Sequence, residues 1–140
     1  MKKIILGVDY GDARTGLALN AGTFAFGAGC VRCEGMRRTA EAVAAAAAEK
    51  NAELIVVGNP VNMNGTEGPR SEKCRAFAHM LGELSGIPVE LYDERLTTVS
   101  AHNIMSELNV RGKKRKDNVD ELSATIILQD YIDRNKDTVG

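Results

Sequence analysis

Tryptophan is absent from the sequence, and the 140 residues include only two histidines, three cysteines and three prolines. Two histidines leave little scope for a histidine-rich zinc site. An odd number of cysteines argues against a disulfide framework. Cys30 and Cys33 form a single Cys-x-x-Cys pair in a segment with the pattern of a strand. We expect them to be free, buried thiols rather than a zinc or redox site.

Long apolar runs and an excess of one charge are missing as well. No stretch approaches the roughly 18 residues of a membrane helix. Asp9 and Asp12 interrupt the apolar start of the chain, so no signal peptide is expected. The net charge of −1 weakens the case for a DNA-binding scaffold but not for an enzyme with acids in its site and bases around it. We expect a cytoplasmic protein whose residues 1–140 form one domain.

The apolar residues that are present recur with periods typical of an α/β protein. Short apolar runs predict strands at residues 3–10, 15–20, 26–32, 53–58 and 89–92. Helical spacing predicts helices at residues 36–50, around 74–84, around 101–108 and at 118–135. This order predicts a five-stranded mixed sheet, with three antiparallel strands followed by two parallel ones and helices on both faces.

Acidic residues stand where two of these strands end. Asp9 closes the first strand after a largely apolar run, and Glu94 directly follows the fifth. Ligands of open α/β sheets gather beyond the carboxyl ends of the strands. A buried carboxylate must be paired, hydrogen-bonded or bound to a cation, so we favour a functional role for Asp9. The presence of Glu94, taken by itself, is explained equally well by a surface ion pair with Arg95.

A third acid, Asp120, lies in the first turn of the last predicted helix, where an acid favours the helix dipole. Asn118 and Glu121 have the spacing of a capping box, which makes Glu121 the structural acid and leaves Asp120 without a local role. Carboxylates from three distant segments could therefore meet at one site. Such an all-oxygen cluster suits Mg²⁺ or Mn²⁺. Two such ions, roughly 3.5–4 Å apart, can clamp a phosphodiester for in-line attack.

Basic residues accompany these acids. The run from Arg111 to Lys116 precedes Asp120, and such a run is by itself usually a solvated loop. Beside an acidic metal site it predicts a clamp for backbone phosphates. The predicted substrate-binding residues are Arg14 and Arg95, which are close in sequence to proposed ligands, Asn62 in the polar loop at 59–69, and Lys113, Lys114, Arg115 and Lys116.

Four motifs, in order along essentially the whole chain, resemble the YqgF family, also called RuvX. They are Asp9-Tyr10-Gly11-Asp12-Ala13-Arg14-Thr15-Gly16; Val57-Gly58-Asn59-Pro60 with Asn62-Met63-Asn64-Gly65; Asp93-Glu94-Arg95-Leu96-Thr97-Thr98; and Lys116 with Val119-Asp120 and Ser123-Ala124. The resemblance implies an RNase H-like fold related to RuvC resolvases, with Asp9, Glu94 and Asp120 as an acidic triad. Asn59 and Asn64 depart from the family's usual Leu and Asp, in the loop expected to face the substrate.

The function that the resemblance implies is a metal-dependent endo- or exonuclease that processes the 5′ end of pre-16S rRNA in ribosome biogenesis. One alternative is a Holliday junction resolvase acting on branched DNA, for which a homodimer would be favoured. Another is a non-catalytic nucleic-acid or nucleotide-binding module, because Asp9-Tyr10-Gly11 followed by Gly16 also resembles the first phosphate loop of actin-like and sugar-kinase domains. Those domains need a second lobe to enclose ATP, and this chain is too short to supply it.

Overall fold

The computed structural model describes residues 3–60, 68–93 and 115–135, with only the backbone described for residues 115–120. Five strands form one sheet in the order β3-β2-β1-β4-β5. The strands are β1 (Ile5–Asp9), β2 (Arg14–Ala21), β3 (Phe24–Arg32), β4 (Leu54–Asn59) and β5 (Val89–Asp93). Neighbouring strands are antiparallel from β3 to β1 and parallel from β1 to β5, which confirms the predicted mixed sheet.

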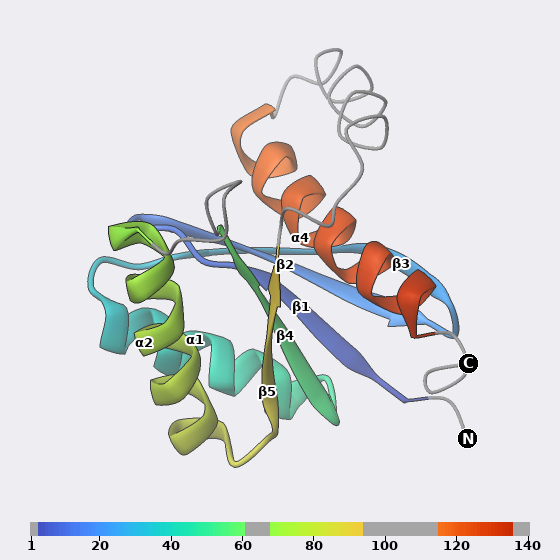
Figure 1. Ribbon diagram of the computed structural model, residues 1–140, viewed down its shortest axis with the longest axis horizontal. Helices are drawn as coiled ribbons and strands as arrows, with labels where there is room; N and C mark the ends of the chain where they lie inside the picture. Colours follow the sequence, from blue (N-terminus) through green and yellow to red (C-terminus); the bar gives the residue numbers. More distant parts are fainter. Residues whose placement is uncertain (1–2, 61–67, 94–114, 136–140) are drawn as a thin grey trace.

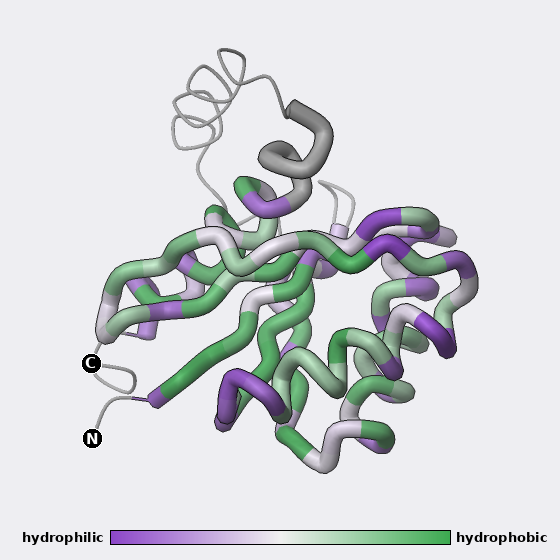
Figure 2. Tube along the Cα trace, turned by 180° about the vertical axis from the view of Figure 1, so that it is seen from behind, coloured by the Kyte–Doolittle hydropathy of each residue, from purple (hydrophilic) through white to green (hydrophobic). Residues whose placement is uncertain are grey.

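Helices cover both faces of this sheet (Figure 1). On one face lie α1 (Met36–Glu49) and α2 (Pro69–Ser85), and on the other α4 (Arg115–Arg134). The strands are apolar along most of their length, and the polar residues gather on the helices and the turns (Figure 2). All six residues of β4 are buried, as expected for a parallel strand covered on both sides.

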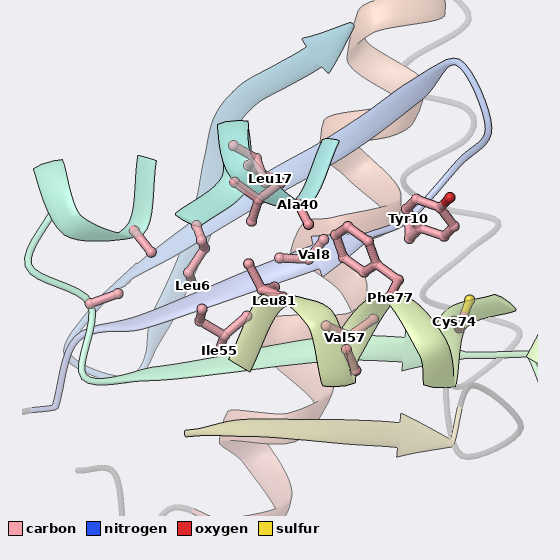
Figure 3. Close-up of a cluster of buried hydrophobic side chains, with 14 residues drawn as sticks. Leu6, Val8, Tyr10, Leu17, Ala40, Ile55, Val57, Cys74, Phe77 and Leu81 are labelled. Atoms are coloured by element: carbon pink, nitrogen blue, oxygen red, sulfur yellow. The ribbon is translucent and has the colours of Figure 1, made fainter. Parts of the chain in front are cut away.

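The two faces of the sheet carry separate apolar cores, because successive side chains of a strand point to opposite faces. Leu6, Val8, Ile55 and Val57 pack with α1 and α2, and Phe77 is the largest fully buried side chain of this core (Figure 3). The core under α4 contains Ile5, Ala18, Ala25, Leu54, Val56, Tyr92, Ala124, Ile127, Leu128 and Ile132.

The helix α4 lies close against β1 at Gly7. A Cβ atom at Gly7 would lie 2.8 Å from the Cβ of Leu128 and 3.1 Å from the carbonyl oxygen of Ala124. Any side chain at this position would therefore push α4 away from the sheet. The absence of one lets the helix backbone rest directly on the central strand.

Element boundaries agree with the sequence prediction to within a few residues, and the clearest difference is the start of α4. Residues 111–116 were predicted to be a basic loop, yet Arg115 and Lys116 begin the helix, three residues before Asn118. Arginine and lysine are good helix formers, so a charge run need not break a helix. The predicted end of α2 is confirmed, since Gly86 closes it in the left-handed conformation at φ 70°. The predicted helix around 101–108 lies outside the described residues.

No helix in the described part of the chain is both long and apolar enough to span a membrane. Cys74 is buried, whereas Cys30 and Cys33, which were expected to be buried, are only half-buried.

Replacing Gly7 with alanine should lower the free energy of unfolding by about 1–3 kcal/mol, the usual cost of overpacking a core. The substitution Gly82→Ala is the matched control, because a Cβ there meets nothing closer than 3.6 Å and alanine favours the helix. Urea unfolding measures both. A Gly7→Ala variant as stable as the wild type would show that the close contact of α4 with β1 is not a constraint.

Candidate functional site

The carboxyl ends of three strands meet at one edge of the sheet. Asp9 ends β1, Asn59 ends β4 and Asp93 ends β5. Val8 is level with Val57, and Asn59 is level with Asp93, so the three ends lie side by side. Since neighbouring strands are about 4.8 Å apart, the backbone of β5 is roughly 10 Å from that of β1 at this level.

Asp9 lies on the face of the sheet that α4 covers. It shares the odd-numbered positions of β1 with Ile5 and Gly7, both of which contact α4 or its core. Its side chain is half-buried, so the carboxylate is partly shielded from water. Arg14 lies on the same face, two residues before Gly16, which pairs with Asp9 across the antiparallel ladder. A cation and a carboxylate therefore lie near each other at this end of the sheet.

The turn after Asp9 depends on Gly11. A Cβ atom at Gly11 would lie 2.2 Å from the carbonyl oxygen of Arg14, a distance that no side chain can occupy. The Thr15 hydroxyl accepts a hydrogen bond from the Gly11 amide at 3.3 Å. This close approach is the physical reason for the glycine of the first motif.

The direction of α4 places the turn that contains Asp120 beside the carboxyl end of β1. The side chains of Gln129 and Glu121 accept hydrogen bonds from the amides of Ala25 and Gly29, so α4 runs antiparallel to β3. Because β3 and β1 point the same way, α4 is also antiparallel to β1. Ala124 lies over Gly7, and one helical turn back from Ala124 is Asp120.

Glu121 anchors this part of α4 to the edge strand. Its carboxylate accepts a hydrogen bond of 2.6 Å from the Gly29 amide. It also lies against Gly27, where a Cβ atom would come within 3.2 Å of the Glu121 side chain. Glu121 is thus a structural acid, as predicted, but not through a capping box. Because α4 begins at Arg115, Asn118 is inside the helix and cannot be its cap.

Two tyrosines tie α4 to β5. Tyr92 of β5 donates a hydrogen bond to the Asp130 carboxylate, which Arg134 also contacts at 3.3 Å. Tyr131 of α4 donates to Glu90 of β5 at 2.7 Å. Burial, followed by the hydrogen bond to Glu90, raises the pKa of Tyr131 to about 12, and burial and Asp130 raise the pKa of Tyr92 still further. The strand that leads to Glu94 and the helix that carries Asp120 are therefore joined directly.

The predicted site residues divide into three groups. Asp9 and Arg14 are described completely, and both lie at the carboxyl end of β1. Asp120, Arg115 and Lys116 are described by their backbone, in the first half of α4. Glu94, Asn62, Arg95, Lys113 and Lys114 lie outside the described residues. Among the side chains that are described, no three His, Cys, Asp or Glu residues gather into a metal site.

Two contacts near the site have no signal in the sequence. Ser71 of α2 donates a hydrogen bond of 2.6 Å to Asn59, and both side chains are buried. Arg70, the residue before Ser71, donates a hydrogen bond to the carbonyl oxygen of Tyr10, directly after Asp9. These contacts join residues 12 and 60 positions apart, so neither spacing nor periodicity could have identified them.

Comparison with known proteins gives a family match over nearly the whole chain. Residues 3–134 match the family model described as "RuvX: Holliday junction resolvase". A protein of Ruminiclostridium cellulolyticum named "Putative pre-16S rRNA nuclease" is 41% identical over 133 residues, which cover 93% of this chain and 94% of the relative. A protein of the same name from Clostridium kluyveri is 42% identical over 132 residues, covering 93% and 96% of the two chains.

Solved structures show the same fold at low sequence identity. RuvC from Thermus thermophilus, in complex with a Holliday junction substrate, superposes with a TM-score of 0.66 at 14% identity. The superposition covers 98% of this chain and 97% of RuvC. The fowlpox virus Holliday junction resolvase has a TM-score of 0.57 at 12% identity, with 94% and 99% of the two chains covered. The RuvC-like, RNase H-type fold implied by the four motifs is thereby confirmed.

Replacing Glu121 with alanine leaves the Gly29 amide without its acceptor, and we expect this to lower the free energy of unfolding by about 1–3 kcal/mol. Hydrogen exchange of the Gly29 amide should become faster. Glu121→Gln, which keeps an oxygen acceptor, is the control and should lose less. Unchanged exchange at Gly29 in the alanine variant would exclude this anchor.

Stability should also fall in alkali through the two tyrosines. A tyrosine whose pKa is higher in the folded protein stabilises the fold fully below its ordinary pKa of 10, and this stabilisation is lost as pH rises toward 12. The difference in free energy of unfolding between the wild type and Tyr131→Phe should therefore shrink between about pH 10 and 12. Urea unfolding across this range measures it, and a constant difference would contradict the proposed tie between α4 and β5.

Proposed function

The chain belongs to the RuvX family, and on that premise we propose that it is a metal-dependent nuclease that processes the 5′ end of pre-16S rRNA. The observation that carries the proposal is the identity of about 40% with pre-16S rRNA nucleases over almost the full length of both chains. The fold is consistent with it, because Asp9 and Asp93 end strands at the same edge of the sheet, and the turn of α4 that contains Asp120 passes the carboxyl end of β1. We further propose that the protein works in the cytoplasm, where rRNA is processed.

Asp9, Glu94 and Asp120 are the proposed metal ligands and catalytic residues. Asp9 is half-buried on the α4 face, at the level where the turn of α4 with Asp120 passes β1. Glu94 follows β5 directly, two residues beyond Tyr92, whose side chain lies on the same α4 face. A set of three carboxylates fits Mg²⁺ or Mn²⁺, which prefer oxygen ligands, and a pair of these ions is the expected arrangement.

When bound, such ions activate water for attack on phosphorus and neutralise charge on the phosphate. The chain's own part is to hold the scissile phosphate in line with that water. Asp9, Glu94 and Asp120 would hold these ions. Products with 5′-phosphate and 3′-hydroxyl ends are expected for a nuclease of this fold.

Basic residues would hold the sugar-phosphate backbone around this centre. Arg14 lies on the α4 face of the sheet, as Asp9 does. Arg32 of β3 is the cross-strand partner of Arg14, at the same end of the sheet. Arg115 and Lys116 begin α4, whose next turn carries Asp120. We assign the same role to Arg95, Lys113 and Lys114, which are near proposed ligands in the sequence. Asn62, in the polar loop at 59–69, is assigned it as well. Phosphate contacts of this kind position a substrate without reading its sequence.

A second candidate is the resolution of Holliday junctions, which the description of the matching family model favours. Junction cutting needs two cleavages related by two-fold symmetry and hence a homodimer. The two functions share one chemistry and differ in substrate, so a single assay compares them.

We expect Asp9→Asn to reduce the rate of Mg²⁺- or Mn²⁺-dependent cleavage at least about a hundredfold. This exceeds the usual effect of removing a group that only supports a metal ligand. Glu94→Gln and Asp120→Asn should behave alike, while Glu83→Gln, at an exposed acid of α2 that pairs with His79, should cut at the wild-type rate. The assay compares precursor 16S rRNA ends, plain single strands and four-way junctions, with circular dichroism as the folding control. Full activity of Asp9→Asn would contradict the proposed metal site. Cleavage of four-way junctions alone would show that the substrate is branched DNA and not rRNA.

A further inference from the structure

The turn that follows Asp9 is held by an arginine of α2. Arg70 donates a hydrogen bond to the carbonyl oxygen of Tyr10, the residue directly after Asp9. Its guanidinium carbon lies 5.8 Å from the centre of the Tyr10 ring, and its nitrogen lies 3.7 Å from the Asp12 carboxylate. One side chain thus touches the backbone, the ring and the charged group of the same short segment.

The ring of Tyr10 is fixed from the other side. It stacks on Phe77 of α2 with ring centres 4.2 Å apart and an angle of 16° between the planes (Figure 3). Tyr10 is only 4% exposed and Phe77 is completely buried, so the stacked pair is enclosed by the core.

Arg70 occupies a position in its helix where a positive charge is unfavourable unless other groups interact with it. It lies in the first turn of α2, directly after Pro69, where a cation opposes the helix dipole. The ion pair with Asp12 and the hydrogen bond to the Tyr10 carbonyl offset this cost. Lys73, one turn further on, contacts the same Asp12 carboxylate at 3.5 Å but makes no contact with Tyr10 among the described residues.

We propose that Arg70 is a positioning residue that fixes the Asp9 carboxylate through the backbone of Tyr10. With the Tyr10 ring and carbonyl both held, the Cα atom of Tyr10 is fixed, and Asp9 on its other side pairs with Gly16 in the β1–β2 ladder. The peptide between Asp9 and Tyr10 is therefore held at both ends, which restricts the direction in which the Asp9 side chain extends. This inference rests on the proposed function, in which Asp9 holds the metal ions. A carboxylate that is already fixed in place binds a metal ion more tightly, because binding does not have to order the side chain. A small displacement of a reacting group also lowers the reaction rate.

Removal of the Arg70 side chain should therefore weaken metal binding much more than RNA binding. We expect Arg70→Ala to raise the dissociation constant for Mn²⁺ about 10- to 100-fold, as for other residues that support a metal ligand, and to lower kcat with little change in KM. Lys73→Ala is the matched control, because it removes a cation from the same helix and the same Asp12 pair, and its Mn²⁺ affinity should stay within about twofold of the wild type. Calorimetry or electron paramagnetic resonance of Mn²⁺ gives the affinity without an activity assay.

Three results would overturn the proposal. If Arg70 binds RNA phosphates instead, Arg70→Ala and Lys73→Ala will both raise KM in a salt-dependent way and leave the Mn²⁺ affinity unchanged. If Arg70 only stabilises the fold, the melting temperature of Arg70→Ala will fall without any loss of Mn²⁺ affinity. Should Arg70→Ala fail to fold, Arg70→Lys serves in its place, because an ammonium cannot reproduce the fork of the guanidinium. An Arg70→Lys variant with wild-type Mn²⁺ affinity would be the third contrary result.

Asp9→Asn separates this proposal from the function on which it rests. If Asp9→Asn abolishes Mn²⁺ binding while Arg70→Ala does not weaken it, the metal site stands and the positioning role of Arg70 fails. If Asp9→Asn itself binds Mn²⁺ like the wild type, the proposed function fails.

Discussion

The contact between α4 and the central strand at Gly7 is the constraint on which the rest of the architecture depends. Because Gly7 has no side chain, the helix rests on β1 with Ala124 and Leu128 directly above it. The direction of α4 then decides which of its turns passes Asp9. Glu121 and the two tyrosine contacts secure the helix to opposite edges of the sheet, at β3 and β5. A short strand, a glycine and a long helix together define the edge where the candidate site lies.

Much of the fold could be predicted from the sequence because it follows from local physics. Short apolar runs identified the five strands and helical spacing identified α1, α2 and α4, all in their correct order, and Gly86 ended α2 where expected. The start of α4 was predicted too late. The spacing of Asn118 and Glu121 is that of a capping box, but the helix extends one turn further into the basic run, and Glu121 bonds to the distant Gly29 instead. A local motif was outweighed by a tertiary contact.

The candidate site could be predicted only in part, for a related reason. Motifs identified Asp9 and its neighbours, but not how they are held. Arg70 contacts the Tyr10 carbonyl across 60 residues, and Tyr92 contacts Asp130 across 38. Nothing in the spacing of these residues encodes such contacts, since they depend on how α2 and α4 pack on the sheet. The sequence shows that Gly7 interrupts an apolar strand, which indicates a close approach, but not that α4 is the partner.

The central claim is that Asp9, Glu94 and Asp120 hold the same divalent ions. A crystal structure of the protein soaked with Mn²⁺, with the anomalous scattering of manganese recorded, tests it most directly. We predict one or two manganese peaks beyond the carboxyl end of β1, within about 2.0–2.3 Å of carboxylate oxygens from all three residues. Manganese bound elsewhere, or an Asp9 carboxylate that faces away from every peak, would contradict it.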